Sequence, residues 1–321
     1  VGDSLPITSG VVVIAFFSII NMFVGLPFKI YATFGIEQKF GFNNTTIGLF
    51  IMDLIKGLIL SVVIGVPLLY LVLWLMQVMG EYWWVWVWLV LVGFSLLILI
   101  IYPTFIAPLF NKFAPLEDGE LKSTIYSLLE RCGFKSNGVF VMDGSKRSSH
   151  GNAYFTGIGK AKRIVFFDTL IKQLTPSEIE AVLAHELGHF KKKHILKQII
   201  LSFVINLVVL FILSLLIHQE SFYNSLGVTS VTNYNGLLLF TLLVGLLSFP
   251  FAPIASFFSR KNEFEADGFA KEYSNKNDLI TGLVKLYKDN ASTLTPDHLY
   301  VKFYYSHPPA SVRIKALEQL T

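Results

Sequence analysis

The chain has 321 residues, of which 53% are hydrophobic and only 15% are charged, and its mean hydropathy is +0.59. This composition excludes an ordinary soluble domain and favours a membrane protein. The single cysteine, Cys132, excludes an intrachain disulfide and a multi-cysteine metal site, and the modest net charge of +4 gives no sign of a nucleic-acid partner.

Five stretches are candidates for crossing a bilayer, because lipid offers no partners to backbone groups and a spanning helix therefore needs about 20 mostly apolar residues. We expect spans at Val11–Pro27, Ile47–Met76, Tyr82–Ile106, Ile195–Ile217 and Gly236–Phe258. The polar blocks 111–194 and 259–321 hold 13 and 9 of the 26 lysines and arginines, whereas the loops 77–81 and 218–235 hold none. The positive-inside rule therefore predicts that both polar blocks face the cytosol.

Two strands are predicted in the first polar block. The segments SSHGNAYFTG and AKRIVFFDTLI combine β-branched and aromatic residues with polar or glycine residues at their ends. Gly157, Gly159 and Lys160 lack the spacing of a phosphate-binding loop and are predicted to lie in a turn between the strands. Because an extended peptide can bind by adding a strand to a free sheet edge, Asn152 is a candidate for holding a substrate backbone.

A helix is predicted next, in the segment LTPSEIEAVLAHELGHF. Thr175 is a favourable N-cap, Pro176 is a favourable first helical residue, and Glu178 completes a capping box. Apolar residues then recur at helical spacing, which predicts one buried face.

His185 and His189 are four residues apart on this helix, so they project from nearly the same side. That arrangement suits two imidazole ligands on one zinc ion. Glu186 lies about 60° around the helix from His189, near the metal without having to bind it, which is the position of a general base. The alternative interpretation is that both histidines lie on the helix surface and bind no metal.

The second polar block begins with SRKNEFEADGFAKEYS, which the hairpin of the last two spans returns to the same side of the membrane. A catalytic zinc site needs a third protein ligand, and Glu263 is the candidate. Asp267 lies one turn further on the same face, where it can accept a hydrogen bond from a ligand histidine. Glu265 is expected to point away, about 200° around the helix. The alternative is an exposed run of charges.

The segment YYSHPPASVRIKALEQL contains two further candidates. His307 precedes a stiff Pro-Pro pair, and Arg313 lies early in the predicted helix that follows. Either side chain can stabilise an oxyanion, and for each a purely structural role remains the alternative.

Taken together, these motifs resemble one family. HELGH, SRKNEFEAD after a transmembrane hairpin, SSHGNAYFTG upstream, and SHPP followed by an arginine are similar to the type I CaaX prenyl endopeptidases, which are integral membrane zinc metallopeptidases. The resemblance covers most of the chain, including EQKFGFNNTT and IYPTFIAPLFNKFAPLEDGEL. It implies an α-helical multi-pass membrane protein with a cytosol-facing, zincin-like (gluzincin) α+β catalytic region that contains a small sheet.

The resemblance also implies a role for each candidate residue and one Zn²⁺ per chain. His185, His189 and Glu263 would be metal ligands, Glu186 and His307 catalytic residues, Asp267 a residue that orients a ligand, and Asn152 and Arg313 substrate-binding residues. The expected regions are a three-span transmembrane region at 1–110, a catalytic region with the active-site helix at 111–194, a transmembrane hairpin at 195–258, and a catalytic region carrying the third ligand at 259–321. The family normally has seven spans around a water-filled chamber, so two further helices are expected upstream of Val1.

The implied function is removal of the C-terminal tripeptide from prenylated proteins at a membrane, which is the endoplasmic reticulum if the organism is eukaryotic. Two alternatives stay open. One is a metallopeptidase for quality control of membrane proteins in general, with the same zinc chemistry. The other is a non-enzymatic membrane scaffold with a structural zinc ion, although such a closed site needs no general base at Glu186.

Overall fold

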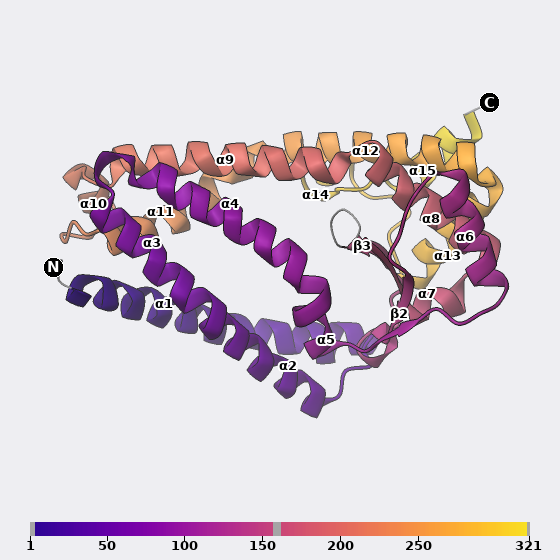
Figure 1. The fold of residues 1–321 in the computed structure, drawn as a ribbon, viewed down its shortest axis with the longest axis horizontal. Coiled ribbons are helices and arrows are strands. Elements are labelled where there is room, and N and C mark those ends of the chain that lie inside the picture. The colour runs from indigo at the N-terminus through magenta and orange to yellow at the C-terminus, as the bar shows by residue number, and fades with distance from the viewer. Residues whose placement is uncertain (1–3, 157–161, 320–321) are drawn as a thin grey trace. The chain divides into compact units, whose positions relative to one another are not determined.

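The computed structural model describes residues 4–156 and 162–319 (Figure 1). Its contacts divide the chain into two compact units. The first comprises the residues up to Gly41, Thr45–Ile98 and Ile199–Phe249, and the second comprises Phe42–Asn44, Leu99–Gln198 and the residues from Pro250 onward. The four-region division expected from the sequence stays a prediction.

The first unit is built from long apolar helices. Those lying wholly or mostly in it are α1 (Ser4–Ile30), α2 (Ile47–Leu60), α3 (Val66–Val78), α4 (Trp83–Ile101), α9 (His194–Leu216) and α11 (Asn233–Ser248), with the short α10 (Glu220–Asn224). In the described part of the chain, five helical stretches are long and apolar enough to cross a membrane: Ile7–Glu37, Ile47–Val78, Gly80–Phe110, His194–Leu216 and Asn233–Tyr273. The five spans expected from hydropathy are therefore all present as helices.

Two of these helical stretches have bounds that differ clearly from the expectation. The first does not end at Pro27: α1 passes through this proline and continues as a π-helix over Tyr31–Glu37. A proline removes only one backbone donor, and the apolar residues after it still favour a helix with satisfied backbone groups. The fifth stretch contains a single 3₁₀ turn, Phe249–Phe251, and α12 (Ala252–Tyr273) follows at once with a proline in its first turn. The helix with the acidic residues thus begins inside the expected span.

The second unit contains the sheet and the helices packed near it. Its helices are α5 (Ala107–Phe110), α6 (Glu120–Arg131), α7 (Asp168–Gln173), α8 (Pro176–Lys191), α12, α13 (Lys276–Asp289), α14 (His298–Tyr304) and α15 (Ala310–Gln319), and its strands are β1 (Phe113–Pro115), β2 (Val139–Met142), β3 (Ala153–Thr156) and β4 (Arg163–Phe167). The sheet has the order β1-β2-β4-β3, with β2 and β4 parallel and the outer pairs antiparallel.

The two strands predicted around Asn152 are β3 and β4. They pair antiparallel, with Ala153 opposite Phe166 and Thr156 opposite Arg163. The turn expected at Gly157, Gly159 and Lys160 lies outside the described residues. In the described sheet β3 pairs on one side only, so its other edge is the free edge to which an extended peptide could add.

The core of the second unit surrounds α8. Ile179, Leu183 and Leu187 on this helix are at most 1% exposed and pack with buried residues of α6, β4, α12 and α13. α12 approaches α8 very closely, since a Cβ atom on Gly188 would lie only 2.9 Å from the Cα atom of Ala266. This close packing keeps α8, which carries the histidines, next to α12, which carries the acidic residues.

Candidate metal centre

The start of α8 is fixed by the capping box that its sequence predicted. The backbone N–H of Glu178 donates to Thr175 Oγ1, and the backbone N–H of Thr175 donates to the Glu178 carboxylate at 2.8 Å. Lys285 Nζ on α13 donates to the same carboxylate at 2.7 Å. The N-terminus of α8 is therefore tied to a second helix before the chain reaches the histidines.

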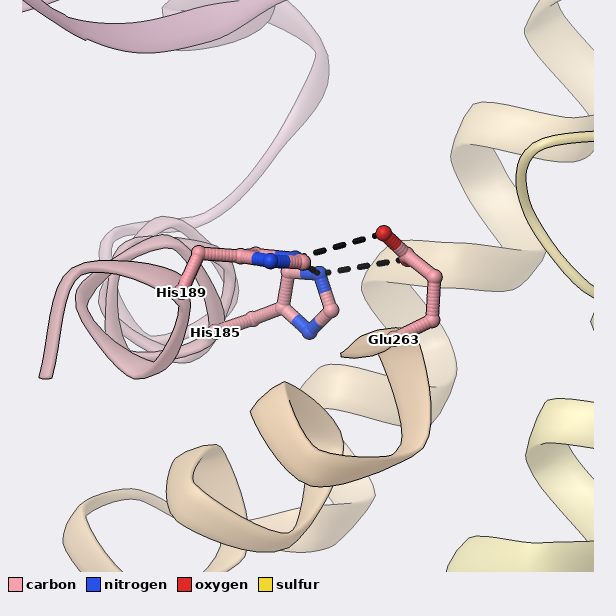
Figure 2. Close-up of side chains that lie close together, drawn as sticks. All are labelled: His185, His189 and Glu263. Carbon is pink, nitrogen blue, oxygen red and sulfur yellow. Dashed lines mark hydrogen bonds and ion pairs between the residues drawn. The ribbon is translucent and has the colours of Figure 1, made fainter. Parts of the chain in front are cut away.

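His185, His189 and Glu263 converge as the helical spacing predicted (Figure 2). The two Nε2 atoms of the histidines lie 3.2 Å apart. His185 Nε2 lies 3.4 Å from Glu263 Oε2, and His189 Nε2 lies 3.2 Å from Glu263 Oε1. One donor atom from each residue lies within 4.8 Å of the other two, so the three can share one ion.

The chemistry of these donors fits a divalent metal. Glu263 Oε2 is buried, and its nearest nitrogen neighbours, His185 Nε2 and Arg313 Nη1, both lie 3.4 Å away without the geometry of a hydrogen bond. A buried carboxylate oxygen with no well-formed hydrogen bond is incompletely satisfied, and a cation held between the three residues would bind it directly. Two imidazoles and one carboxylate are a usual protein ligand set of catalytic zinc, with further positions left for water or substrate.

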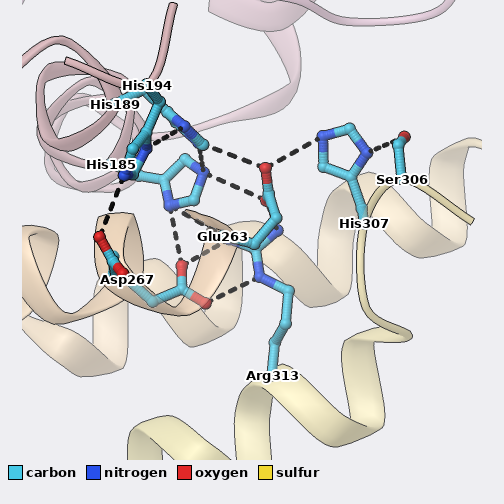
Figure 3. Close-up of polar contacts among 9 residues, drawn as sticks. His185, His189, His194, Glu263, Asp267, Ser306, His307 and Arg313 are labelled. Atoms are coloured by element: carbon cyan, nitrogen blue, oxygen red, sulfur yellow. Dashed lines mark hydrogen bonds and ion pairs between the residues drawn. The ribbon is translucent and has the colours of Figure 1, made fainter. Parts of the chain in front are cut away.

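Asp267 orients His185 from behind, and Arg313 holds Asp267 (Figure 3). His185 Nδ1 lies 2.8 Å from Asp267 Oδ1, and the Arg313 guanidinium donates to both Asp267 oxygens, at 2.9 Å from Nε and 2.5 Å from Nη2. All three side chains are buried. Burial alone lowers the pKa of His185, but the carboxylates of Asp267 and Glu263 outweigh it and raise this pKa to about 8.

The structure distinguishes His307 from Arg313, which the sequence could not. The His307 side chain is 63% exposed, with Nε2 lying 3.4 Å from Glu263 Oε1 and Nδ1 lying 2.9 Å from Ser306 Oγ. Arg313 is buried and engaged with Asp267. Both residues line a cavity of about 460 Å³, but only His307 is exposed enough to contact a bound peptide freely.

Glu186 and Asn152 lie at more open positions. Glu186 is partly exposed on α8 and lies between the two histidines in sequence. Asn152 is exposed immediately before β3; its Oδ1 accepts from the Ala153 N–H at 2.8 Å, and its carbonyl accepts from the Phe167 N–H at 2.9 Å. Since α8 also contacts β3, the free sheet edge belongs to the same packed region as the helix that carries the two candidate histidine ligands.

His194 and Glu265 are residues that the sequence reasoning missed. No role was predicted for His194, yet its Nδ1 lies 3.1 Å from His189 Nδ1. Glu265 was expected to point away from Glu263 around the helix, and no part in the site was predicted for it. It does face away from the metal ligands on its own helix, but its Oε2 lies 3.1 Å from His194 Nε2. The sequence does contain a signal for this contact, namely a third histidine five residues after His189.

Comparisons with known proteins agree with this architecture. The family profile described as "CAAX prenyl protease N-terminal, five membrane helices" matches residues 2–112, and the profile of peptidase family M48 matches residues 115–321. The chain is 40% identical over 325 residues to CAAX prenyl protease 1 of Saccharomyces cerevisiae, an alignment that covers 95% of this chain and 71% of the yeast protein.

Relatives from other organisms are similarly close. The Arabidopsis thaliana CAAX prenyl protease 1 homolog is 41% identical, over 91% of this chain and 69% of its own length. The Homo sapiens homolog is 34% identical, over 99% of this chain and 75% of its own. The crystal structure of S. mikatae Ste24p superposes with a TM-score of 0.92 at 39% identity, covering 98% of this chain and 76% of the other.

Proposed function

The chain belongs to peptidase family M48, and from that premise we propose that it removes the C-terminal tripeptide of prenylated CaaX proteins at a membrane, using one zinc ion. It is a metallopeptidase and a multi-pass membrane protein. The observation that carries the proposal is the convergence of His185, His189 and Glu263 from two closely packed helices. Family membership also argues against the non-enzymatic scaffold.

The ligand roles are assigned from these contacts. His185 and His189 would bind the zinc ion through Nε2, and Glu263 would bind it through its carboxylate. A zinc ion in such a site supplies a Lewis acid for the scissile carbonyl and lowers the pKa of a water molecule. Asp267, held by Arg313, keeps the His185 ring oriented.

The remaining steps fall to residues around the ligands. Glu186 accepts the proton of the attacking water and passes it to the leaving amine, which is a general acid–base role that a partly exposed carboxylate beside the ligands can perform. His307 is exposed next to Glu263 and can donate to the oxyanion that develops on the substrate. We assign the free edge of β3, with Asn152 at its start, to the extended substrate backbone.

We propose that the polar blocks face the cytosol, in the endoplasmic reticulum membrane if the organism is eukaryotic. The support is the charge asymmetry of the loops, since lysine and arginine favour the cytoplasmic side.

A matched pair of peptides tests the substrate class. Both have the same CaaX sequence, and only one carries a farnesyl thioether on its cysteine. The purified protein is expected to release the tripeptide from the farnesylated peptide with a strong preference, while Glu186→Gln should be about 10²- to 10⁴-fold slower on that peptide. Equal turnover of both peptides, with cleavage at several bonds, would instead favour general quality control of membrane proteins.

A further inference from the structure

The ring of His189 is held by a chain of contacts that runs away from the metal-binding side (Figure 3). His189 Nδ1 lies 3.1 Å from His194 Nδ1, and His194 Nε2 lies 3.1 Å from Glu265 Oε2. The His194 side chain is only 2% exposed, whereas Glu265 is 38% exposed. The chain therefore leads from the candidate metal ligand through a buried imidazole to a carboxylate at the surface.

A tight turn brings His194 to this position. α8 ends at Lys191, and α9 begins at His194 after only two intervening residues. The second of them, Lys193, has φ of 58°, in the left-handed region that costs a non-glycine residue about 1 kcal/mol or more. The turn places the first residue of α9 against the last turn of α8, with His194 Nδ1 within hydrogen-bond distance of His189 Nδ1.

The contacts from His189 through His194 to Glu265 fit one assignment of hydrogens to the two imidazole rings. The Glu265 carboxylate accepts only, so His194 donates to it from Nε2. In neutral His194 the other nitrogen, Nδ1, is then the acceptor, and the hydrogen between the two rings belongs to His189 Nδ1. His189 is thereby left with a lone pair on Nε2, the atom that faces Glu263 and His185.

We infer that His194 and Glu265 are positioning residues that hold the His189 ring in the orientation and tautomer required of a metal ligand. The inference rests on the proposed metal site and extends it. Each ligand histidine then depends on a carboxylate of α12: His185 contacts Asp267 directly, and His189 reaches Glu265 through His194. Such outer partners contribute about 10- to 100-fold to metal affinity when the ligand itself is unchanged.

Zinc titration of the purified, metal-stripped protein against a chromophoric chelator tests the inference. His194→Phe keeps an aromatic ring but loses both hydrogen bonds, and Glu265→Ala removes the final acceptor. We expect each to weaken zinc binding by about 10- to 100-fold. His194→Gln should recover most of the affinity, because its amide can accept from His189 and donate to Glu265. Glu272→Ala removes an exposed carboxylate of the same helix and should bind like the parent.

A second readout is the visible absorption of the cobalt-substituted protein, which reports the ligand geometry directly. The bands should change in His194→Phe and Glu265→Ala and stay unchanged in Glu272→Ala. Parent-like zinc affinity and spectra in both His194→Phe and Glu265→Ala would overturn the inference while leaving the metal site intact. If His194→Phe does not fold, Glu265→Ala decides, since its side chain is partly exposed. A parent protein that binds no zinc would overturn the proposed site and this inference together.

Discussion

Three acidic residues of α12 contribute to one site in different ways, and the geometry of the helix determines which. Glu263 and Asp267 are four residues apart and share the face that meets α8. Glu263 presents both oxygens to the histidines, whereas Asp267 contacts the far side of the His185 ring. Glu265, between them in sequence, points elsewhere and meets the same site only through His194. The three carboxylates thus differ in role because their side chains project from α12 in different directions.

Substitution of Glu186 separates metal binding from catalysis. Glu186→Gln keeps the size of the side chain and leaves the three proposed ligands in place, but it removes the carboxylate that we propose as the proton acceptor. We expect about one zinc ion per chain to be retained and kcat to fall by about 10²- to 10⁴-fold. Metal analysis and single-substrate kinetics on the same preparation check this. Retained turnover would remove Glu186 from the mechanism.

The raised pKa of His185 predicts how zinc affinity depends on pH. In the metal-free protein the carboxylates of Asp267 and Glu263 favour the protonated ring, with a pKa of about 8. Zinc binding must displace that proton, so the apparent affinity should be nearly constant above pH 8 and fall by about tenfold per pH unit below it. Zinc titrations between pH 6 and pH 9 measure this. An affinity that does not change between pH 6 and pH 8 would contradict the assignment.

At the scale of elements, the closeness of α8 to α12 sets the ligand geometry. Gly188 lies between the two ligand histidines in sequence, and its missing side chain is what lets the α12 backbone approach at Ala266. A Cβ atom there would also lie 3.0 Å from the Ala266 carbonyl oxygen and 3.1 Å from Phe269 Cβ. This carbonyl oxygen and the Cα atom of Ala266, 2.9 Å from the added Cβ, are backbone atoms, which cannot move aside as a flexible side chain would. Any widening of the gap would move Glu263 relative to the histidines.

Gly188→Ala is therefore expected to weaken the site without touching a ligand. Overpacking of this kind costs about 1–3 kcal/mol of stability, and the shifted helix should reduce zinc affinity as well. Gly268→Ala on α12 is the matched control, because its added Cβ atom would meet nothing within 4 Å. Thermal unfolding and zinc titration of both variants check the prediction. If Gly188→Ala behaves like Gly268→Ala, close helix packing is not what sets the ligand geometry.

The sequence predicted those elements whose signals are local. The capping box of α8 and the strands β3 and β4 were recognisable because a few neighbouring residues determine each of them. The C-terminal end of the first span and the start of α12 could not be predicted in this way, because a helix can either end at a proline inside an apolar run or continue through it. His194 was missed for a different reason: its contact with His189 depends on a left-handed backbone conformation at a lysine, which residue type does not predict.

At the scale of the whole molecule, the chain combines apolar helices with a packed metallopeptidase region. The apolar helices fix the protein in a bilayer, and the second unit brings all the candidate ligands together from α8 and α12. Spacing on each helix predicted the pairs within it, since one turn relates His185 to His189 and Glu263 to Asp267. The separate environments of His307 and Arg313 needed the tertiary structure, because one residue is exposed and the other is buried.

We propose that this membrane protein hydrolyses prenylated peptides by means of a zinc ion held by His185, His189 and Glu263. The most direct test follows cleavage of a farnesylated CaaX peptide by the purified protein after chelation and after zinc is returned. We expect chelation to abolish tripeptide release and about one zinc ion per chain to restore it, in the parent but not in His185→Ala. Tripeptide release that persists in the metal-free protein, or that returns in His185→Ala, would contradict it.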